Sequence, residues 1–309
     1  MKLLSYSLQA QSRVGVWCHP YILDLGAAGA HVLGENSETE CFLNACQSMM
    51  ALLHLWDAHW KLVSEVVDRI QHDLSINQEE YVAKKLLIPV EDVQILAPLP
   101  APGKVICVAG NYPAPGAREK PEYPVIFLKP SSTVTGPGMP VWLSDITKDV
   151  AIEVELALVI SKTARLVSIE ESFSYIAGYI LANDIGDRAL EKRTSQWTSG
   201  KMFDSFTPMG PWLVTKDEIG FDDSLEMLSL VNGEVVQKGS TSEMFYNGSE
   251  LVSILSDLTT LRPGDVILTG STKCMGNEPN PLGAIADGDS VSISIQGLGE
   301  LTNPVKKEL

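Results

Sequence analysis

Two glutamates on one face of a short apolar segment are the residues of this chain best suited to chemistry. Glu153 and Glu155 lie in the run 152–160, where apolar residues occupy every even position. Because side chains alternate across a β-strand, both carboxylates project from the other face, with Cα atoms roughly 6–7 Å apart. Two like charges beside a buried stripe are costly unless a positive group neutralises them. The pattern is typical of a divalent-cation site, and a solvated outer face of the strand is the alternative.

A third carboxylate follows the next apolar segment of the chain. Asp184 comes directly after the run 175–182, where it stands at the mouth of an expected strand. Carboxylates without histidine or cysteine describe a hard-cation site, so we expect Mg²⁺ or Mn²⁺, with Ca²⁺ as a further option. All five histidines lie in the first quarter of the chain, which argues against zinc at these carboxylates.

Composition and charge exclude several classes of protein. The formal net charge is −16, whereas a nucleic-acid-binding protein needs a basic surface. No run of apolar residues approaches the roughly 18 that a membrane span needs, and the first residues lack the apolar core of a secretory signal. The five cysteines show no paired spacing, which is typical of reduced thiols. We therefore expect a cytoplasmic protein that binds neither nucleic acid nor membrane.

The elements that must position the carboxylates fall into two regions. The first region combines short strand-like runs with an amphipathic helix at about 40–72, where apolar residues recur every three or four positions. Three prolines in 95–103 indicate a linker, so we expect a small N-terminal α/β domain at 1–97 and a second domain at 98–309. The second region is rich in strands, with a hairpin through Asn232-Gly233 and its clearest helix at 249–258. A doubly wound sheet would need helices between the strands, and the pattern lacks them.

An ordered set of motifs in the second region resembles the fumarylacetoacetate hydrolase family. The motifs are Lys104–Tyr112, Phe127–Pro130, Glu153-Val-Glu155, Ala182-Asn-Asp184, Arg188, Gly200–Asp204, Pro208–Trp212, Val231–Gly233, Leu261–Gly270 and Gly297–Asn303. The resemblance covers about residues 98–305. It implies an α+β, mostly β fold, in which the catalytic domain is a mixed β-sandwich roll. It also implies a homodimer.

The resemblance implies a role for each of several polar residues. Glu153, Glu155 and Asp184 would hold the metal, which would leave the pocket suited to a small anionic oxo-acid substrate. Lys201 and Arg188 would face this substrate as catalytic residues. Two further residues are expected to bind it, namely Ser271 through its hydroxyl group and Lys129.

The chain departs from the family's pattern beside the expected site. The family's lid helix commonly carries a histidine and a glutamate that orient or activate the attacking water, and here these positions hold Pro115 and Arg118. Glu119, or else Glu122, is the candidate base in their place, because a carboxylate in a dry site can have a pKa near neutrality. An ordinary charge on the lid loop is the alternative account of either residue. Glu191 stands where the family has glutamine, in the substrate-binding region. It would repel an anionic ligand unless it is protonated or paired.

These residues predict a divalent-metal-dependent enzyme. The first expectation is a hydrolase that cleaves a carbon–carbon bond in a small β-diketo acid of the acylpyruvate type through a metal-stabilised enolate. The alternative is a decarboxylase, tautomerase or dehydratase that acts on a 2-oxo acid, such as oxaloacetate or a 2-keto-3-deoxy acid. These lyase-type and tautomerase reactions need the same enolate but no activated water, and the absent histidine favours them. A non-catalytic ligand-binding protein is the third hypothesis.

Overall fold

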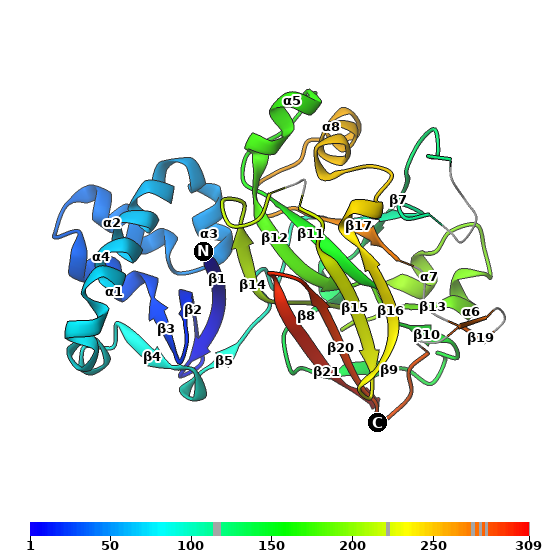
Figure 1. The fold of residues 1–309 in the computed structure, drawn as a ribbon, viewed down its shortest axis with the longest axis horizontal. Helices are drawn as coiled ribbons and strands as arrows, with labels where there is room; N and C mark the ends of the chain where they lie inside the picture. The colour runs from blue at the N-terminus through cyan, green and yellow to red at the C-terminus, as the bar shows by residue number, and fades with distance from the viewer. Residues whose placement is uncertain (114–118, 221–222, 273–275, 278–279, 282–283, 309) are drawn as a thin grey trace.

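The N-terminal third of the chain combines short strands with four helices (Figure 1). The computed structural model describes residues 1–113, 119–220, 223–272, 276–277, 280–281 and 284–308. The first strands are β1 (Lys2–Leu8), β2 (Gln11–Cys18), β3 (Tyr21–Asp24), β4 (Leu87–Pro89) and β5 (Gln94–Ile95). The helices between β3 and β4 are α1 (Leu25–Val32), α2 (Ser37–Ala45), α3 (Met49–His54) and α4 (Trp56–Ala83).

The amphipathic pattern at about 40–72 forms three helices, where one was expected. The sequence breaks the first helix before Ser48, whose hydroxyl group accepts a hydrogen bond from Ala51 N at 3.1 Å and begins α3. The last helix, α4, then continues to Ala83. Among the described residues, no helix is both long and apolar enough to cross a membrane.

One large sheet extends through both regions of the chain (Figure 1). Its further strands are β6 (Val105–Ala109), β7 (Val125–Lys129), β8 (Val134–Thr135), β11 (Val154–Ile160), β12 (Ile176–Asn183), β14 (Thr207–Thr215) and β17 (Val266–Ser271). The strand order is β4-β3-β2-β1-β14-β12-β11-β17-β6-β7. Because Leu3 of β1 pairs with Leu213 of β14, the N-terminal strands continue the sheet that carries the carboxylates.

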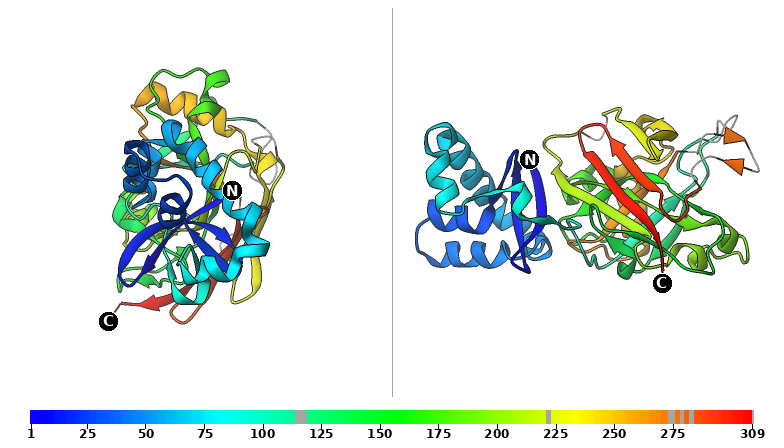
Figure 2. Two further views of the ribbon diagram at one scale, coloured as in Figure 1. Left: turned by 90° about the vertical axis from the view of Figure 1, so that its left-hand side faces the viewer. Right: turned by 90° about the horizontal axis from the view of Figure 1, so that it is seen from below.

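A second sheet packs against this one and completes the expected sandwich (Figure 2). Its strands, in spatial order, are β16 (Glu234–Ser240), β15 (Glu226–Val231), β20 (Ser290–Ile295), β21 (Gly299–Lys307) and β9 (Val141–Leu143). Asn232 and Gly233 join β15 to β16, both with positive φ, as a tight hairpin turn requires. The mostly β, α+β fold that the sequence predicts is confirmed.

Several short elements lie between the strands of the two sheets. They are β10 (Val150–Ala151), α5 (Ile169–Ser172), β13 (Gly186–Asp187), α6 (Arg188–Glu191), α7 (Thr198–Lys201), α8 (Gly248–Leu258), β18 (Gly276–Asn277) and β19 (Asn280–Pro281), with 3₁₀ turns at Val90–Asp92, Ser131–Thr133, Phe173–Tyr175 and Thr241–Glu243. A capping box between Asn247 and Glu250 begins α8, one residue before the expected start.

Strand β11 is buried on both faces, which explains its continuous apolar character. Leu158 and its even-numbered neighbours face the core between the two sheets. Ala157 and Val159 face another core, which also contains Leu3 and Phe42 of the N-terminal region. The expected alternation is therefore confirmed. Glu153 and Glu155 lie on the same face as Ala157 and Val159, and the N-terminal region packs against the later part of this face. The division of the chain after residue 97 stays a prediction.

Candidate metal centre

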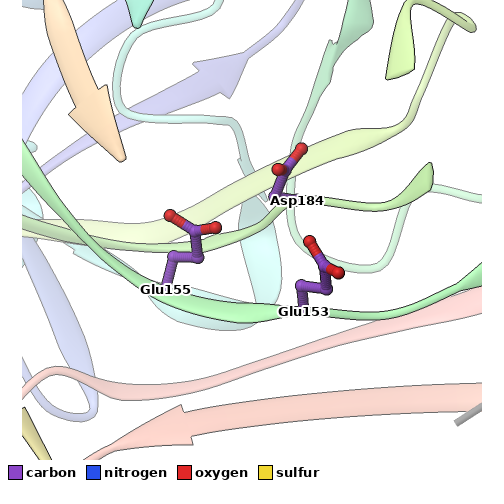
Figure 3. Close-up of side chains that lie close together, drawn as sticks. All are labelled: Glu153, Glu155 and Asp184. Atoms are coloured by element: carbon purple, nitrogen blue, oxygen red, sulfur yellow. The ribbon is translucent and has the colours of Figure 1, made fainter. Parts of the chain in front are cut away.

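Glu153, Glu155 and Asp184 converge at one end of the β11–β12 pair (Figure 3). One oxygen atom from each carboxylate lies within 4.8 Å of the others. The antiparallel register brings them together, because Val154 pairs with Asn183 and Asp184 N donates a hydrogen bond to Glu153 O at 2.9 Å. The cluster that the sequence predicts as a metal site is therefore present in the structure.

Two buried lysines bind the carboxylate of Asp184. Lys129 Nζ lies 2.6 Å from Asp184 Oδ1, and Lys201 Nζ lies 2.8 Å from Asp184 Oδ2. Lys201 Nζ also lies 2.7 Å from Glu153 Oε2. Burial works to raise the pKa of Asp184, but Lys129 and Lys201 outweigh it, so the net shift is downward. Asp184 is consequently ionised and ready to bind a cation.

Glu155 has the opposite electrostatic environment. Its Oε2 accepts a hydrogen bond from Gly270 N at 2.7 Å, and the side chain is buried. Burial raises the pKa of Glu155 well above its ordinary value, and the charges of Asp184 and Glu153 raise it further. Gly270 has φ of +101°, and a Cβ there would stand 2.9 Å from Asn111 Cβ, so only glycine presents this N–H without strain.

The donor set fits a hard divalent cation. The three carboxylates supply oxygen ligands only, which suits Mg²⁺ or Mn²⁺. The three carboxylates and the two lysines together leave a formal charge of −1 on the cluster. A divalent cation would neutralise this charge, so the residues present fit the metal that the sequence predicts.

The expected catalytic residues Lys201 and Arg188 lie on the short helices α7 and α6. Lys201 is buried and its ammonium group contacts two of the three carboxylates. Arg188 is partly exposed, with Nη1 3.7 Å from Asp149 Oδ1. Glu191, which ends α6, is half-buried beside Lys201. The structure thus brings Lys201 and Glu191 to the metal cluster. The catalytic roles of Lys201 and Arg188 and the substrate-binding role of Glu191 stay predictions.

Ser271 lies opposite Glu155 in the pairing of β11 with β17. Its hydroxyl oxygen accepts a hydrogen bond from Gln237 Nε2 at 3.1 Å. Gln237 is buried and also accepts from Val154 N, between the two glutamates, at 3.1 Å. Sequence reasoning missed Gln237, because Val236 and Gln237 are both buried on β16 and strand alternation therefore gives no signal for it. Its contacts make it a positioning residue for both Ser271 and the glutamates.

The geometry does not test the expected roles of Lys129 in substrate binding and of Glu119 as a base. Lys129 Nζ already donates to Asp184 Oδ1, Ile185 O and Phe206 O, so it positions a carboxylate, and its substrate-binding role stays a prediction. Glu119 is exposed, and its role as a base also stays a prediction. Pro115 and Arg118 lie outside the described residues.

Comparisons with known proteins agree with this site. The family model described as fumarylacetoacetate (FAA) hydrolase C-terminal matches residues 104–306. The rat (Rattus norvegicus) mitochondrial oxaloacetate tautomerase Fahd2a is 37% identical over 250 residues, which cover 79% of this chain and 80% of the relative.

Two solved structures cover the full length of both chains. The fumarylacetoacetate hydrolase from Exiguobacterium antarcticum has a TM-score of 0.78 at 28% identity, with 100% of each chain covered. The maleylpyruvate hydrolase from Sphingobium sp. SYK-6, in complex with manganese(II) and pyruvate, has a TM-score of 0.74 at 28% identity, with 100% of each chain covered.

Proposed function

This chain belongs to the fumarylacetoacetate hydrolase family, and we propose that it is a divalent-metal-dependent tautomerase that converts the enol of a small 2-oxo dicarboxylic acid to the keto form. Oxaloacetate is the substrate of first choice. The observation that carries the proposal is the cluster of Glu153, Glu155 and Asp184 with Lys201 between two of them. The similarity to the rat oxaloacetate tautomerase supports the reaction type.

The charge of the site supports an anionic substrate. With the two buried lysines, the three carboxylates carry a net charge of −1, and a divalent cation changes it to +1. A bound Mg²⁺ or Mn²⁺ would supply Lewis-acid polarisation of a substrate carbonyl group. A pocket of this charge favours binding of a carboxylate and stabilises negative charge that develops on an enolate oxygen.

The residues of the chain have distinct tasks in this proposal. Burial disfavours charge on Lys201, but the charges of Asp184 and Glu153 act against it, and the pKa of Lys201 is raised well above its ordinary value. Lys201 therefore provides a permanent positive charge beside the developing enolate. Ser271 accepts a hydrogen bond from Gln237 and donates a long one, of 3.4 Å, to Thr272 O. Rotation of the hydroxyl group would turn this proton toward a substrate carboxylate.

Hydrolysis of an acylpyruvate is the second candidate function. The full-length match to two hydrolases favours it. Hydrolysis also needs a residue that activates water, and the two family positions for that task are Pro115 and Arg118. Hydrolysis was the first expectation from the sequence. We propose tautomerisation first, because the similarity to a tautomerase and these two residues support it.

A parallel assay tests this choice. The decay of enol-oxaloacetate and the cleavage of an acylpyruvate are followed by ultraviolet absorbance with the same Mn²⁺-loaded protein. We expect the protein to accelerate the decay of enol-oxaloacetate. We expect the rate of acylpyruvate cleavage to be lower than this rate by at least about 100-fold, because general acid–base catalysis usually contributes a factor of that size. Cleavage of acylpyruvate without any effect on the enol would replace the proposal by its second candidate.

The expected homodimer is part of the same proposal. Strand β7 ends the large sheet in its spatial order, and Val125 and Leu128 on this strand are 50% and 55% exposed. An exposed apolar edge strand can pair with a second copy of the chain. Light scattering after size-exclusion chromatography should give twice the 33.6 kDa of one chain, and the mass of one chain would contradict the dimer.

A further inference from the structure

Glu191 and Lys201 share a small space that two glycines leave open. A Cβ atom at Gly186 would stand 2.2 Å from Glu191 Oε1 and 2.7 Å from Lys201 Cε. A Cβ atom at Gly200 would stand 2.6 Å from Glu191 Cγ. The helix α6 that carries Glu191 is fixed by Asp187, which accepts a hydrogen bond from Leu190 N at 2.9 Å. The backbone therefore holds the Glu191 carboxyl group beside Lys201.

The carboxyl group of Glu191 differs in its hydrogen bonding from the carboxylates of the metal cluster. Both oxygens of Asp184 accept hydrogen bonds from lysines, and Glu155 Oε2 accepts one from Gly270 N. Within the described part of the chain, the Glu191 carboxyl group forms no comparable hydrogen bond. It is half-buried and still reachable. Such a group can exchange a proton without loss of a bond that the fold needs.

Glu191 lies in an environment that favours the protonated form of its carboxyl group. An exposed glutamate does not have such an environment. Burial raises the pKa of Glu191, and Glu153 and Asp184 raise it further, whereas Lys201 and Lys129 lower it. These groups belong to α7, β7 and the ends of β11 and β12, while Arg188 lies on the same helix as Glu191. The net direction is upward, toward the range in which a carboxyl group serves as a general acid.

We propose that Glu191 is the acid–base residue that delivers a proton to carbon 3 of the bound enol, an inference that rests on the proposed tautomerase function. The enol oxygen first loses its proton to water, which leaves an enolate. The carbon–carbon π pair then takes the proton of the Glu191 carboxyl group, so a C3–H bond forms and the C2 carbonyl is restored. The Glu191 carboxylate regains a proton from water. No oxidant or reductant takes part.

Lys201 is less suited to this step. Its ammonium group donates hydrogen bonds to Glu153 Oε2, Asp184 O and Asp184 Oδ2, so its three protons are held by the metal cluster. The acid form of Glu191 also preserves the net positive charge of the loaded site, which an ionised Glu191 would cancel. Glu191 as a proton donor is therefore compatible with an anionic substrate, which resolves the repulsion expected from the sequence.

Substitution of Glu191 by glutamine tests the role, because glutamine has nearly the same shape and cannot deliver the proton. With Mn²⁺-loaded protein, we expect Glu191→Gln to lower kcat for ketonisation by about 100-fold or more, with little change in KM. The kcat–pH profile should lose the limb that reports an acid. Exchange of the C3 hydrogens of oxaloacetate with deuterium from solvent, followed by NMR, should fall in parallel. Glu170→Gln, an exposed glutamate on α5, is the matched control.

The outcomes separate this role from the proposed function. If Glu191→Gln keeps the kcat and the pH profile of the wild type, the role of Glu191 is overturned and the proposed function is not. A loss of activity that follows a loss of Mn²⁺ affinity or of melting temperature also overturns it, because Glu191 would then be structural. Wild-type protein that exchanges no C3 hydrogen of any 2-oxo acid overturns the proposed function, and this role with it.

Discussion

Lys129 and Asp184 form a buried ion pair, with Lys129 Nζ 2.6 Å from Asp184 Oδ1 and both side chains almost fully excluded from solvent. Removal of one partner from such a pair leaves an uncompensated buried charge, at a cost of about 3–5 kcal/mol. We therefore expect Lys129→Met to lower the free energy of unfolding by about this amount in EDTA. Saturating Mn²⁺ should reduce the loss, because the cation compensates the charge of Asp184.

Urea unfolding in EDTA and in Mn²⁺ measures the two values. Lys84→Met is the matched control, since Lys84 forms an exposed pair with Glu80 on α4 and should change the stability little. An equal loss for Lys129→Met in both conditions would show that Asp184 does not bind the metal.

The affinity for Mn²⁺ should rise with pH, because Glu155 must lose its proton to bind the cation. Burial and the neighbouring carboxylates raise the pKa of Glu155 in the folded, metal-free protein. Its protonation therefore stabilises the metal-free fold at pH below the ordinary glutamate pKa, and this stability is lost as the pH rises through the raised pKa. Mn²⁺ binding gains up to about tenfold per pH unit over the same window.

Isothermal titration calorimetry between about pH 5 and about pH 8, in buffers of different ionisation enthalpy, reports both the affinity and the protons released. Glu155→Gln should bind Mn²⁺ weakly with no proton release from this position. A wild-type affinity that is constant over this range would contradict the electrostatic account of Glu155.

Gln237 joins the two halves of the site, and its loss should weaken both. Gln237→Leu removes the acceptor of Val154 N and the donor to Thr272 O, and each buried group left unpaired costs about 1–3 kcal/mol. We expect lower stability and a raised KM for oxaloacetate, because Ser271 loses its orienting partner. Lys238→Leu, at the exposed neighbouring position of β16, is the control for the strand. A variant with lower stability and unchanged KM would show that Gln237 does not position Ser271.

The N-terminal region should unfold together with the catalytic sheet. Leu3 pairs with Leu213 across β1 and β14, and both lie in one core with Phe42 and Val266. Leu3→Ala should lower stability by about 2–5 kcal/mol and shift far-ultraviolet circular dichroism and tryptophan fluorescence transitions together. Two separate transitions, of which only the first moves, would show that the regions are independent.

The sequence predicted the parts of the site that local spacing controls. Glu153 and Glu155 share a face because strands have a period of two, and Asn232-Gly233 forms the expected hairpin turn. The helix break before Ser48 was missed because apolar spacing hides a local cap. Contacts between distant residues left no local signal. The convergence of Lys129 and Lys201 on Asp184 depends on three segments that meet only in the folded chain.

The most direct test of the central claim is the ketonisation rate of enol-oxaloacetate as Mn²⁺ is added back to EDTA-treated protein. We predict no acceleration without metal, a saturable recovery with Mn²⁺, and a loss of more than about 100-fold in Asp184→Asn and Glu155→Gln. Glu79→Gln, an exposed glutamate on α4, should behave as the wild type. Full activity in EDTA, or full Mn²⁺-dependent activity in the two site variants, would contradict a catalytic metal held by Glu153, Glu155 and Asp184.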